Sequence, residues 1–406
     1  MALAGLVLAV LTRRPEFAGL AAPALLLLAT WQSNRPQQLT ISVSADQTRL
    51  TERVDSHARV DIAGQAGFEA ELRIEPSEEI RCGPAVVVPA NRAADGQPDQ
   101  PAATVVLPFT PDRWGRRQVG VLTITLRDRF RLSEGHAQVG LPWIDCRPLP
   151  AILQRSIVLS RLPSRLGEHA ARAAGEGGEF AGVREFVPGD RQRRINWPAT
   201  TRRGTLHLST FAAERTQNLV VIADATADVG EPGSSSLDLV LRGSAGAITK
   251  YLAARDRAGL IVYSNQLTWI SPGQGQRHFQ RLLDVLVAAP TGSDRATALT
   301  RLPRAALPPG ALILVFSPLL DPRLVEALRD LRERGFSVVV VDVLNTEPRH
   351  EGSRLSGLTT RVWRLEQQAI RFSLTQIGVP VVRWDGSSSL DEPLAPYTRR
   401  VMVVRR

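Results

Sequence analysis

The sequence predicts a mixed α/β chain in which a doubly wound sheet is preceded by an antiparallel β-sandwich-like domain and by N-terminal membrane helices. Apolar strands alternate with amphipathic helices after residue 216, which is typical of a parallel sheet covered by helices on both faces. Segments with period-two alternation fill residues 36–150, and two apolar runs lie within residues 1–35. A chain of 406 residues is long enough for two or three domains. We therefore divide it into residues 1–35, 36–150, 151–215 and 216–406.

The first 35 residues predict attachment to the cell membrane. They contain the apolar runs ALAGLVLAVL (2–11) and FAGLAAPALLLLATW (17–31). Each run is shorter than the roughly 20 residues of a straight spanning helix, which leaves open a hairpin or one full and one partial span. A cleaved signal peptide is the alternative, but no basic residue precedes the first run and no small-x-small exit follows the second. We expect residues 1–35 to anchor the chain in membrane lipid.

The β-rich domain, residues 36–150, has the pattern of a structural or interaction module. Segments such as LTISVSA, AELRIEP and RQVGVLTITLRD alternate apolar and polar residues between Asp, Gly and Pro, which indicates an antiparallel sandwich. Cys82 and Cys146 are too few for a disulfide framework and lack the spacing of a zinc site. We expect two buried or spare thiols, which pair only if this domain lies outside the cytoplasm.

The charge balance does not favour a nucleic-acid partner. The net charge of +10 comes almost entirely from arginine, because Lys250 is the only lysine, and the arginines are interspersed with acidic residues. A phosphate-binding surface gathers its positive charge and interleaves aromatic residues, which make up only 5% of this chain. We expect no nucleic-acid binding.

The C-terminal domain, residues 216–406, carries the strand–helix alternation. Its predicted strands are LVVIAD, AGLIVYS, ALILVFS and SVVVVDV, and a late helix is expected from Val362 to Gln376. Ligands of doubly wound sheets bind beyond the carboxyl ends of the strands. The first such end is ADATADVG (223–230), which is therefore the place to expect a site.

An Arg- and Gly-rich connector lies between the two folded domains. It is followed by the segment EFAGVREFVPGDRQRRINW (179–197), which combines an alternating run, a Pro-Gly pair and a cluster of arginines. Its Pro188-Gly189 pair predicts a turn, after which Asp190 is expected to cap a short helix. That helix places Ile195 and Trp197 for packing.

Two interpretations of this segment follow from its charges. If it is a strand, Phe180, Arg184 and Phe186 share an apolar face, and the guanidinium needs a partner. Local candidates are the carboxylates of Glu179, Glu185 and Asp190. We favour a buried clasp between the two domains, with a partner-binding surface as the alternative. Catalysis ranks third, because carboxylates beside several arginines are held ionised and are poor proton donors near neutral pH.

The stretch GEFAGVREFVPGDRQRRINWPATTRRGTLHL (178–208) resembles the signature of the domain of unknown function family 58. The matching positions are Gly178, Glu179, Phe180, Gly182, Arg184, Glu185, Phe186, Gly189, Asp190, Arg194, Trp197 and Gly204. The layout of the whole chain is also similar to that family, in which membrane segments, a β-rich domain and the signature precede a von Willebrand factor A-like domain. Proteins with this layout are associated with MoxR-type AAA+ ATPases, so the resemblance implies such a partner.

The resemblance to von Willebrand factor A-like domains also implies a metal site, although an incomplete one. The D-x-S-x-S element is represented by Asp224, Thr226 and Asp228, and Thr297 or Thr300 stands for the later Thr. The chain reads Ser317-Pro318 where a later Asp is expected, with Asp321 nearby. Oxygen ligands of this kind suit Mg²⁺. Because one ligand is missing, we expect no cofactor, no tight Mg²⁺ or Mn²⁺ binding, and little loss of fold on Asp224→Ala.

The sequence therefore predicts a non-enzymatic, membrane-anchored adaptor or scaffold that acts with a MoxR-type AAA+ ATPase in protein assembly or maturation. An ATP-driven partner places the soluble domains in the cytoplasm. The alternative is a metal-dependent, adhesion-type ligand-binding module, and a hydrolase is the third possibility.

Overall fold

A computed structural model describes Ala29 and residues 39–64, 68–89, 103–128, 134–159, 162–163, 179–187, 195–212, 217–288, 302–347 and 356–398. The chain divides into two compact units, Met1–Pro148 and Leu149–Arg406. Apart from Ala29, the expected membrane anchor of residues 1–35 lies outside the described residues. In the part of the chain that is described, no helix is both long enough and apolar enough to cross a membrane.

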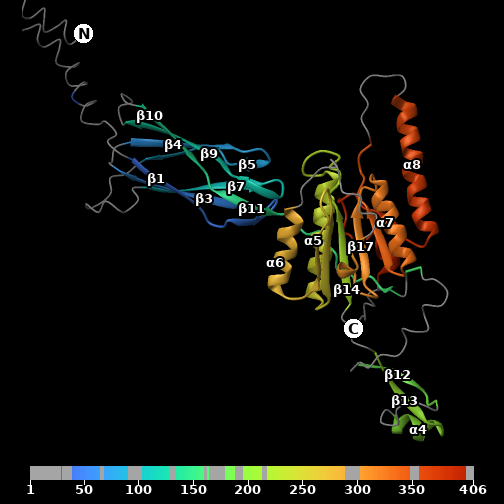
Figure 1. Ribbon diagram of the computed structural model, residues 1–406. Helices are drawn as coiled ribbons and strands as arrows, with labels where there is room; N and C mark the ends of the chain where they lie inside the picture. Colours follow the sequence, from blue (N-terminus) through green and yellow to red (C-terminus); the bar gives the residue numbers. More distant parts are fainter. Residues whose placement is uncertain are drawn as a thin grey trace, which may run out of the picture. The chain divides into compact units, whose positions relative to one another are not determined.

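The described residues of the first unit form three β-sheets, whose strands are seen in Figure 1. Their strand orders are β1-β3-β7-β5, β10-β9-β4-β6 and β2-β11-β8. All of the described pairings are antiparallel except that of β11 with β2. The strands are β1 (Leu39–Ala45), β2 (Arg49–Thr51), β3 (Ser56–Gly64), β4 (Phe68–Pro76), β5 (Ile80–Cys82), β6 (Val86–Pro89), β7 (Ala103–Pro111), β8 (Gly115–Gln118), β9 (Gly120–Asp128), β10 (Glu134–Gly140) and β11 (Trp143–Arg147).

The alternation in the sequence explains how the two four-stranded sheets share one core. Along β3, Ala58, Val60 and Ile62 are buried, and the intervening Arg59 is exposed. These side chains form one apolar cluster with inward residues of β4, β7 and β9. Because successive side chains of a strand point to opposite faces, the same pattern leaves the polar residues outside. The predicted antiparallel sandwich is confirmed.

The two cysteines of this unit are free thiols. Cys82 ends β5 and Cys146 lies in β11. Burial raises the pKa of the Cys82 thiol to about 11 and that of the Cys146 thiol to about 12. For Cys146 the negative charge of Glu52 contributes to the rise in pKa, whereas Arg117 opposes it.

The second unit is built on a six-stranded sheet in the order β16-β15-β14-β17-β18-β19. Its strands pair in parallel, except for the antiparallel edge strand β16. The strands are β14 (Asn218–Asp224), β15 (Arg257–Tyr263), β16 (Thr268–Gly273), β17 (Leu312–Ser317), β18 (Ser337–Asp342) and β19 (Val381–Arg383). The central strands β14 and β17 are buried along almost their whole length, as expected for a parallel sheet covered on both faces.

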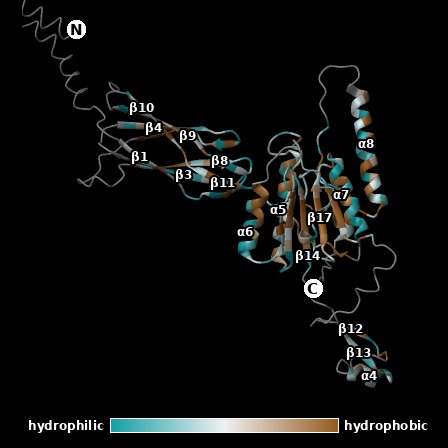
Figure 2. Ribbon diagram, viewed as in Figure 1, coloured by the Kyte–Doolittle hydropathy of each residue, from teal (hydrophilic) through white to brown (hydrophobic). Residues whose placement is uncertain are grey.

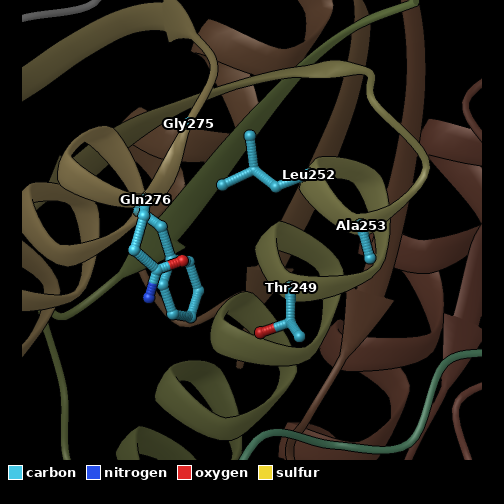
Figure 3. Close-up of a pocket in the computed structure, with 6 residues that line it drawn as sticks. Thr249, Leu252, Ala253, Gly275 and Gln276 are labelled. Carbon is cyan, nitrogen blue, oxygen red and sulfur yellow. The ribbon is translucent and has the colours of Figure 1, made fainter.

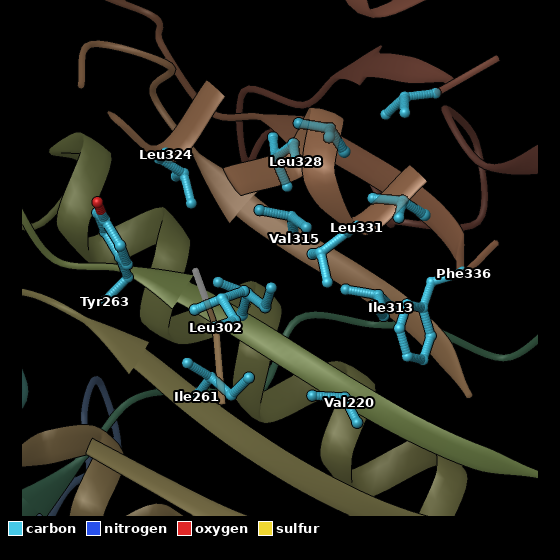
Figure 4. Close-up of a cluster of buried hydrophobic side chains, with 14 of the residues drawn as sticks. Val220, Ile261, Tyr263, Leu302, Ile313, Val315, Leu324, Leu328, Leu331 and Phe336 are labelled. Atoms are coloured by element: carbon cyan, nitrogen blue, oxygen red, sulfur yellow. The ribbon is translucent and has the colours of Figure 1, made fainter. Parts of the chain in front are cut away.

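Helices cover both faces of this sheet (Figure 1). They are α5 (Ser236–Ala253), α6 (Gln276–Val287), α7 (Pro322–Glu333) and α8 (Ser356–Gln376), with 3₁₀ turns η4 (Arg304–Ala306) and η5 (Ala395–Tyr397). On one face, α7 and α8 contribute Leu324, Leu328 and Leu374 to the core with strand residues such as Ile313 (Figure 4). The opposite face is covered by α5, where Gly243 lies against the ring of Phe316. The predicted parallel sheet with helices on both faces is thus confirmed.

Two helix starts illustrate what the sequence pattern does and does not show. Helix α5 begins at a capping box, in which the Ser235 hydroxyl accepts from the Asp238 amide and the Asp238 carboxylate accepts from the Ser235 amide. Helix α8 begins at Ser356, six residues before the expected Val362. The early start was missed because the Ser356-Gly357 pair is typical of a turn.

The first residues after Pro148 are bonded to the α/β unit. The amide of Ala151 donates to the Arg242 carbonyl, and the Ile157 amide donates to the Tyr251 hydroxyl at 3.1 Å. The Asp391 carboxylate accepts from the amides of Gln154 and Arg155, both at 2.8 Å. The segment expected to be a connector therefore begins as part of this unit.

Candidate functional site

The carboxyl edge of the parallel sheet gathers polar side chains at the ends of three strands. Asp224, Ser317 and Asp342 are the last residues of β14, β17 and β18. In the strand register, Asp224 is opposite Tyr263 and Ser317 is opposite Asp342. The sequence-predicted element ADATADVG is therefore located at the edge where ligands of such sheets bind.

Both carboxylate oxygens of Asp224 are hydrogen-bonded by neighbouring groups. Oδ1 accepts from the Thr226 hydroxyl at 2.6 Å and from the Thr226 amide at 3.1 Å. Oδ2 accepts from the Ser317 hydroxyl at 2.5 Å, and the Ser317 hydroxyl oxygen accepts from the Leu319 amide. Asp224, Thr226 and Ser317 are all buried. The carboxylate thus ties the loop after β14 to the loop after β17.

The electrostatic surroundings of Asp224 disfavour its charged form. Burial raises the pKa of this carboxyl, and the negative charge of Asp321 adds to the rise. Hydrogen bonds from Ser317 and Thr226 oppose it. Burial and Asp321 also raise the pKa of Tyr263 to about 12, against a smaller effect of Arg323.

The other expected ligands are separated from this arrangement or already engaged. Asp228 is exposed in the loop after β14. Asp321 caps α7 through the Arg323 amide and forms an ion pair with the Arg323 guanidinium at 2.7 Å. Thr297 and Thr300 lie outside the described residues. Within the described ranges, no three His, Cys, Asp or Glu side chains come close enough together to hold a metal ion.

The hydrogen bonds of Asp224 give it a structural role, because they join the loop after β14 to Ser317 at the end of β17. A cation bound there would need oxygens that the Thr226 and Ser317 donors already use. The expectation that Asp224→Ala is nearly harmless has to be revised, since a buried acceptor of three hydrogen bonds is costly to remove.

Asp342 is a second buried carboxylate at the same edge, and it was not among the residues predicted from the sequence. Its Oδ2 accepts from Arg371 Nε of α8 at 2.6 Å, and its Oδ1 accepts from the Leu344 amide. Burial raises the pKa of the Asp342 carboxyl, whereas Leu344 and Arg371 oppose that rise. An Asp at the end of an apolar strand was the available signal, but its partner lies on a helix whose position depends on the fold.

A cleft and a pocket in the α/β unit are further places where a ligand could bind. A cleft of about 640 Å³ lies along the loops after β14, β18 and β19, and its charged lining residues are Glu231, Glu347, Arg383 and Asp385. A pocket of about 270 Å³ lies between α5 and α6, lined by Thr249, Leu252, Ala253, Gly275, Gln276 and Phe279 (Figure 3). The pocket has no ionisable side chain in its lining, so it supplies neither an acid, a base nor a charged ligand.

The signature segment forms a small module of its own, which we call the β12–β13–α4 module. Strand β12 (Glu179–Glu185) pairs antiparallel with β13 (His207–Ala212), and helix α4 (Trp197–Arg203) precedes β13. A bulge between Phe180 and Gly182 shifts the register of this pairing.

Helix α4 is bonded to β13 through Asn196 and through Thr200, whose hydroxyl accepts from the His207 amide at 3.0 Å. The Asn196 side chain accepts from the Ala199 amide at 3.0 Å, which caps the helix, and donates to the Ser209 hydroxyl at 3.0 Å. At the other end, Gly204 adopts a left-handed conformation with φ of 73°. The sequence Asn-Trp-Pro contains the signal for this start, a capping residue followed by Pro198 in the first turn. The expected cap, Asp190, lies outside the described residues.

The described signature residues are located mainly at the surface of this module. Arg184 and Glu185 are exposed, and the Arg184 guanidinium donates to the Glu185 carbonyl at 3.0 Å. Trp197 is 64% exposed. Within the module itself these two side chains are at the surface, because a two-stranded sheet with one short helix covers too little surface to enclose them. The predicted burial of the segment as a clasp between the two domains stays a prediction. Gly178, Gly189 and Arg194 lie outside the described residues.

Comparisons with known proteins identify a related family but no activity. Residues 182–355 match the family described as Protein of unknown function DUF58. The chain is 27% identical over 187 residues to uncharacterized proteins of Mycobacterium bovis and of two strains of Mycobacterium tuberculosis. The match covers 44% of this chain and 59% of each relative, so it spans only about three-fifths of their length.

Two solved structures overlap with a quarter of the chain. The PKD domain of an M14-like peptidase from a Thermoplasmatales archaeon is 12% identical, with 92% of that domain covered and a TM-score of 0.15. A FixG-related protein from Vibrio parahaemolyticus is 13% identical, with 94% covered and a TM-score of 0.16. Each match covers 25% of this chain. These TM-scores are too low to support a fold assignment.

Proposed function

We propose that this chain is a non-enzymatic, membrane-anchored adaptor that acts with a MoxR-type AAA+ ATPase, and that the β12–β13–α4 module binds this partner. In this proposal the α/β unit is a von Willebrand factor A-like scaffold in the cytoplasm. Residues 1–35, with their two apolar runs, hold it at the membrane.

The observation that carries the proposal is the exposure of the signature residues. Trp197 and Arg184 are both at the surface of the module, and tryptophan and arginine are enriched among the residues that dominate binding at protein interfaces. Val187 and Leu206 are also exposed, and the Phe186 amide, next to Val187 in the chain, donates to the Leu206 carbonyl at 2.8 Å. An apolar and cationic surface of this kind suits a protein partner.

The carboxyl edge of the sheet supports a scaffold rather than an enzyme. The buried carboxylates of Asp224 and Asp342 are engaged by neighbouring donors. A general base needs an accessible lone pair within hydrogen-bond reach of its substrate. In these two side chains the carboxylate oxygens already accept hydrogen bonds from the protein. The same hydrogen bonds disfavour the metal-dependent alternative, because a cation would need these oxygens as ligands.

The experiment is an affinity measurement between the full-length chain in detergent and the MoxR-type AAA+ ATPase of the same organism. Trp197→Ala and Arg184→Ala should each weaken capture by about tenfold or more, as expected for interface residues that dominate binding. Trp269→Ala is the matched control, because Trp269 is a 43% exposed tryptophan on β16.

Thermal unfolding of the same samples separates binding from folding. Both module variants should have the melting temperature of the wild-type chain, since substitutions at exposed positions change stability by less than about 0.5 kcal/mol. Equal capture by the wild type and both variants would refute the module as the binding surface. Absence of any binding by the wild type would refute the choice of partner.

A further inference from the structure

Helix α8 exposes a continuous line of apolar side chains. Leu358, Val362, Leu365 and Phe372 are 62%, 55%, 57% and 65% exposed, and Ala369 is exposed between the last two. Single exposed apolar residues are ordinary on protein surfaces, but an aligned row of them marks a contact surface. We call these five residues the α8 seam.

The α8 seam lies opposite the side by which the helix packs on its own sheet. The inward residues are Trp363, Gln367, Ile370 and Leu374, of which Gln367 and Leu374 are buried. At about 100° per residue, the mean directions of the two rows differ by roughly 150°. Core packing therefore accounts for one row and leaves the other without a role. Figure 1 shows α8 at the outer side of the α/β unit, and Figure 2 shows apolar residues along it.

The spacing of the seam is that of a coiled coil. Its residues follow one another at intervals of four, three, four and three, which places Leu358, Leu365 and Phe372 at d positions and Val362 and Ala369 at a positions. In a parallel coiled coil, a β-branched residue such as Val362 at an a position with leucine at d favours a pair of helices over a larger bundle. The seam spans about two heptads, roughly 21 Å of helix, which suits a modest rather than a permanent contact.

Charged residues beside the seam fit the same arrangement. Arg361 occupies a g position and Glu366 the e position five residues later, and in a parallel pair these two positions of opposite chains face each other. Neither side chain forms an ion pair among the described residues of its own chain. An antiparallel pair centred on Leu365 would instead bring the two Glu366 carboxylates together, which is unfavourable.

We propose that the α8 seam is a self-association surface, on which a second copy of this chain docks with its own α8 parallel and in register. Two symmetry-related Arg361–Glu366 pairs flank the apolar contact. Helix α8 begins one residue after the family match at residue 355 ends. The inference does not depend on the proposed ATPase partner, since the seam and the β12–β13–α4 module have no residue in common.

The first test is sedimentation of the full-length chain in detergent over a concentration series. The wild type should show a reversible monomer–dimer equilibrium, and Leu365→Glu should weaken it by about 100-fold or more, because it buries two unpaired charges. Val54→Glu is the control, since it places the same charge at an exposed apolar residue of the first unit. A wild type that stays monomeric, or a dimer that Leu365→Glu leaves intact, would overturn the proposal.

A charge exchange tests the pairing and the direction. Arg361→Glu and Glu366→Arg should each weaken the dimer by about two- to tenfold, and the double variant should restore it, as for exposed ion pairs. Phe372→Cys should form a disulfide-linked dimer on mild oxidation, whereas the wild type, whose Cys82 and Cys146 lie in the first unit, should not. In an antiparallel pair Phe372 would be opposite Leu358, so failure of both the exchange and the cross-link would contradict the parallel arrangement.

Discussion

The carboxyl edge of the α/β sheet and the β12–β13–α4 module differ in how they use their polar residues. At the sheet edge, Asp224 and Asp342 are buried and hydrogen-bonded by donors from other loops and helices. In the module, Arg184 and Trp197 are exposed. The residues that resemble a ligand site are therefore hydrogen-bonded within the fold, and those that resemble packing residues are at the surface.

The difference shows that residue type alone does not distinguish a ligand-binding residue from one that stabilises the fold. A carboxylate at the end of a parallel strand lies where ligands bind, but at Asp224 the neighbouring Thr226 and Ser317 supply its hydrogen bonds. An arginine among phenylalanines suggests a buried pair, but a two-stranded sheet has too little apolar cover to bury it. Stability measurements on the two regions should separate accordingly.

The largest expected effect is on the ion pair between Asp342 and Arg371, for which Arg371→Ala should lower the free energy of unfolding by about 3 kcal/mol or more. The substitution leaves the Asp342 carboxylate buried without its charged partner. Chemical denaturation provides the measurement. Arg184→Ala is the matched control and should change stability by less than about 0.5 kcal/mol. Equal losses in the two variants would remove the distinction between the regions.

Asp224→Ala should lower the stability by about 2 to 3 kcal/mol, since it leaves three buried donors from Thr226 and Ser317 without an acceptor. Asp224→Asn keeps one carbonyl oxygen in place and should cost about half as much. Calorimetric titration of the wild type with Mg²⁺ accompanies this test. Micromolar affinity that Asp224→Ala abolishes would support the metal-dependent alternative.

The pH dependence of stability gives a third contrast, between Asp224 and Asp385. Burial raises the pKa of Asp224 above 3.8 in the folded state. The contribution of Asp224 to the free energy of unfolding is therefore complete below pH 3.8, and it is lost as the pH rises through the folded-state pKa. The pKa of exposed Asp385 is lowered by hydrogen bonds from Ser387, so its contribution is present above 3.8 and is lost on acidification.

This contrast is measured by denaturing the wild type, Asp224→Asn and Asp385→Asn at a series of pH values. The advantage of the wild type over Asp224→Asn should shrink as the pH rises, and its advantage over Asp385→Asn should grow. If the stability of both variants changed with pH in the same way, the pKa of Asp224 would not be raised by burial.

The smallest effect is expected inside the module. Asn196→Ala removes the cap of α4 and the hydrogen bond to Ser209, and should cost about 1 kcal/mol of local stability. Hydrogen exchange of the amides of α4 and β13 reports this change directly. Faster exchange across the α/β sheet as well would show that the module is not independent of it.

The sequence by itself determined the elements and their order. Period-two alternation gave inward residues such as Val60, and the apolar runs ending in Asp224 and Ser317 marked buried parallel strands. The sequence also located the first strand end as the polar edge of the sheet. These features follow from local periodicity, because helices and strands repeat their side-chain directions every 3.6 and 2 residues.

Tertiary structure alone decided which polar groups meet and which stay exposed. Asp224 accepts from Ser317, 93 residues away, only because β17 pairs with β14 in a particular register. Arg184 is exposed only because β12 has β13 as its single described partner strand. Whether a side chain is buried depends on what covers it, and that cover comes from elements that are distant in sequence.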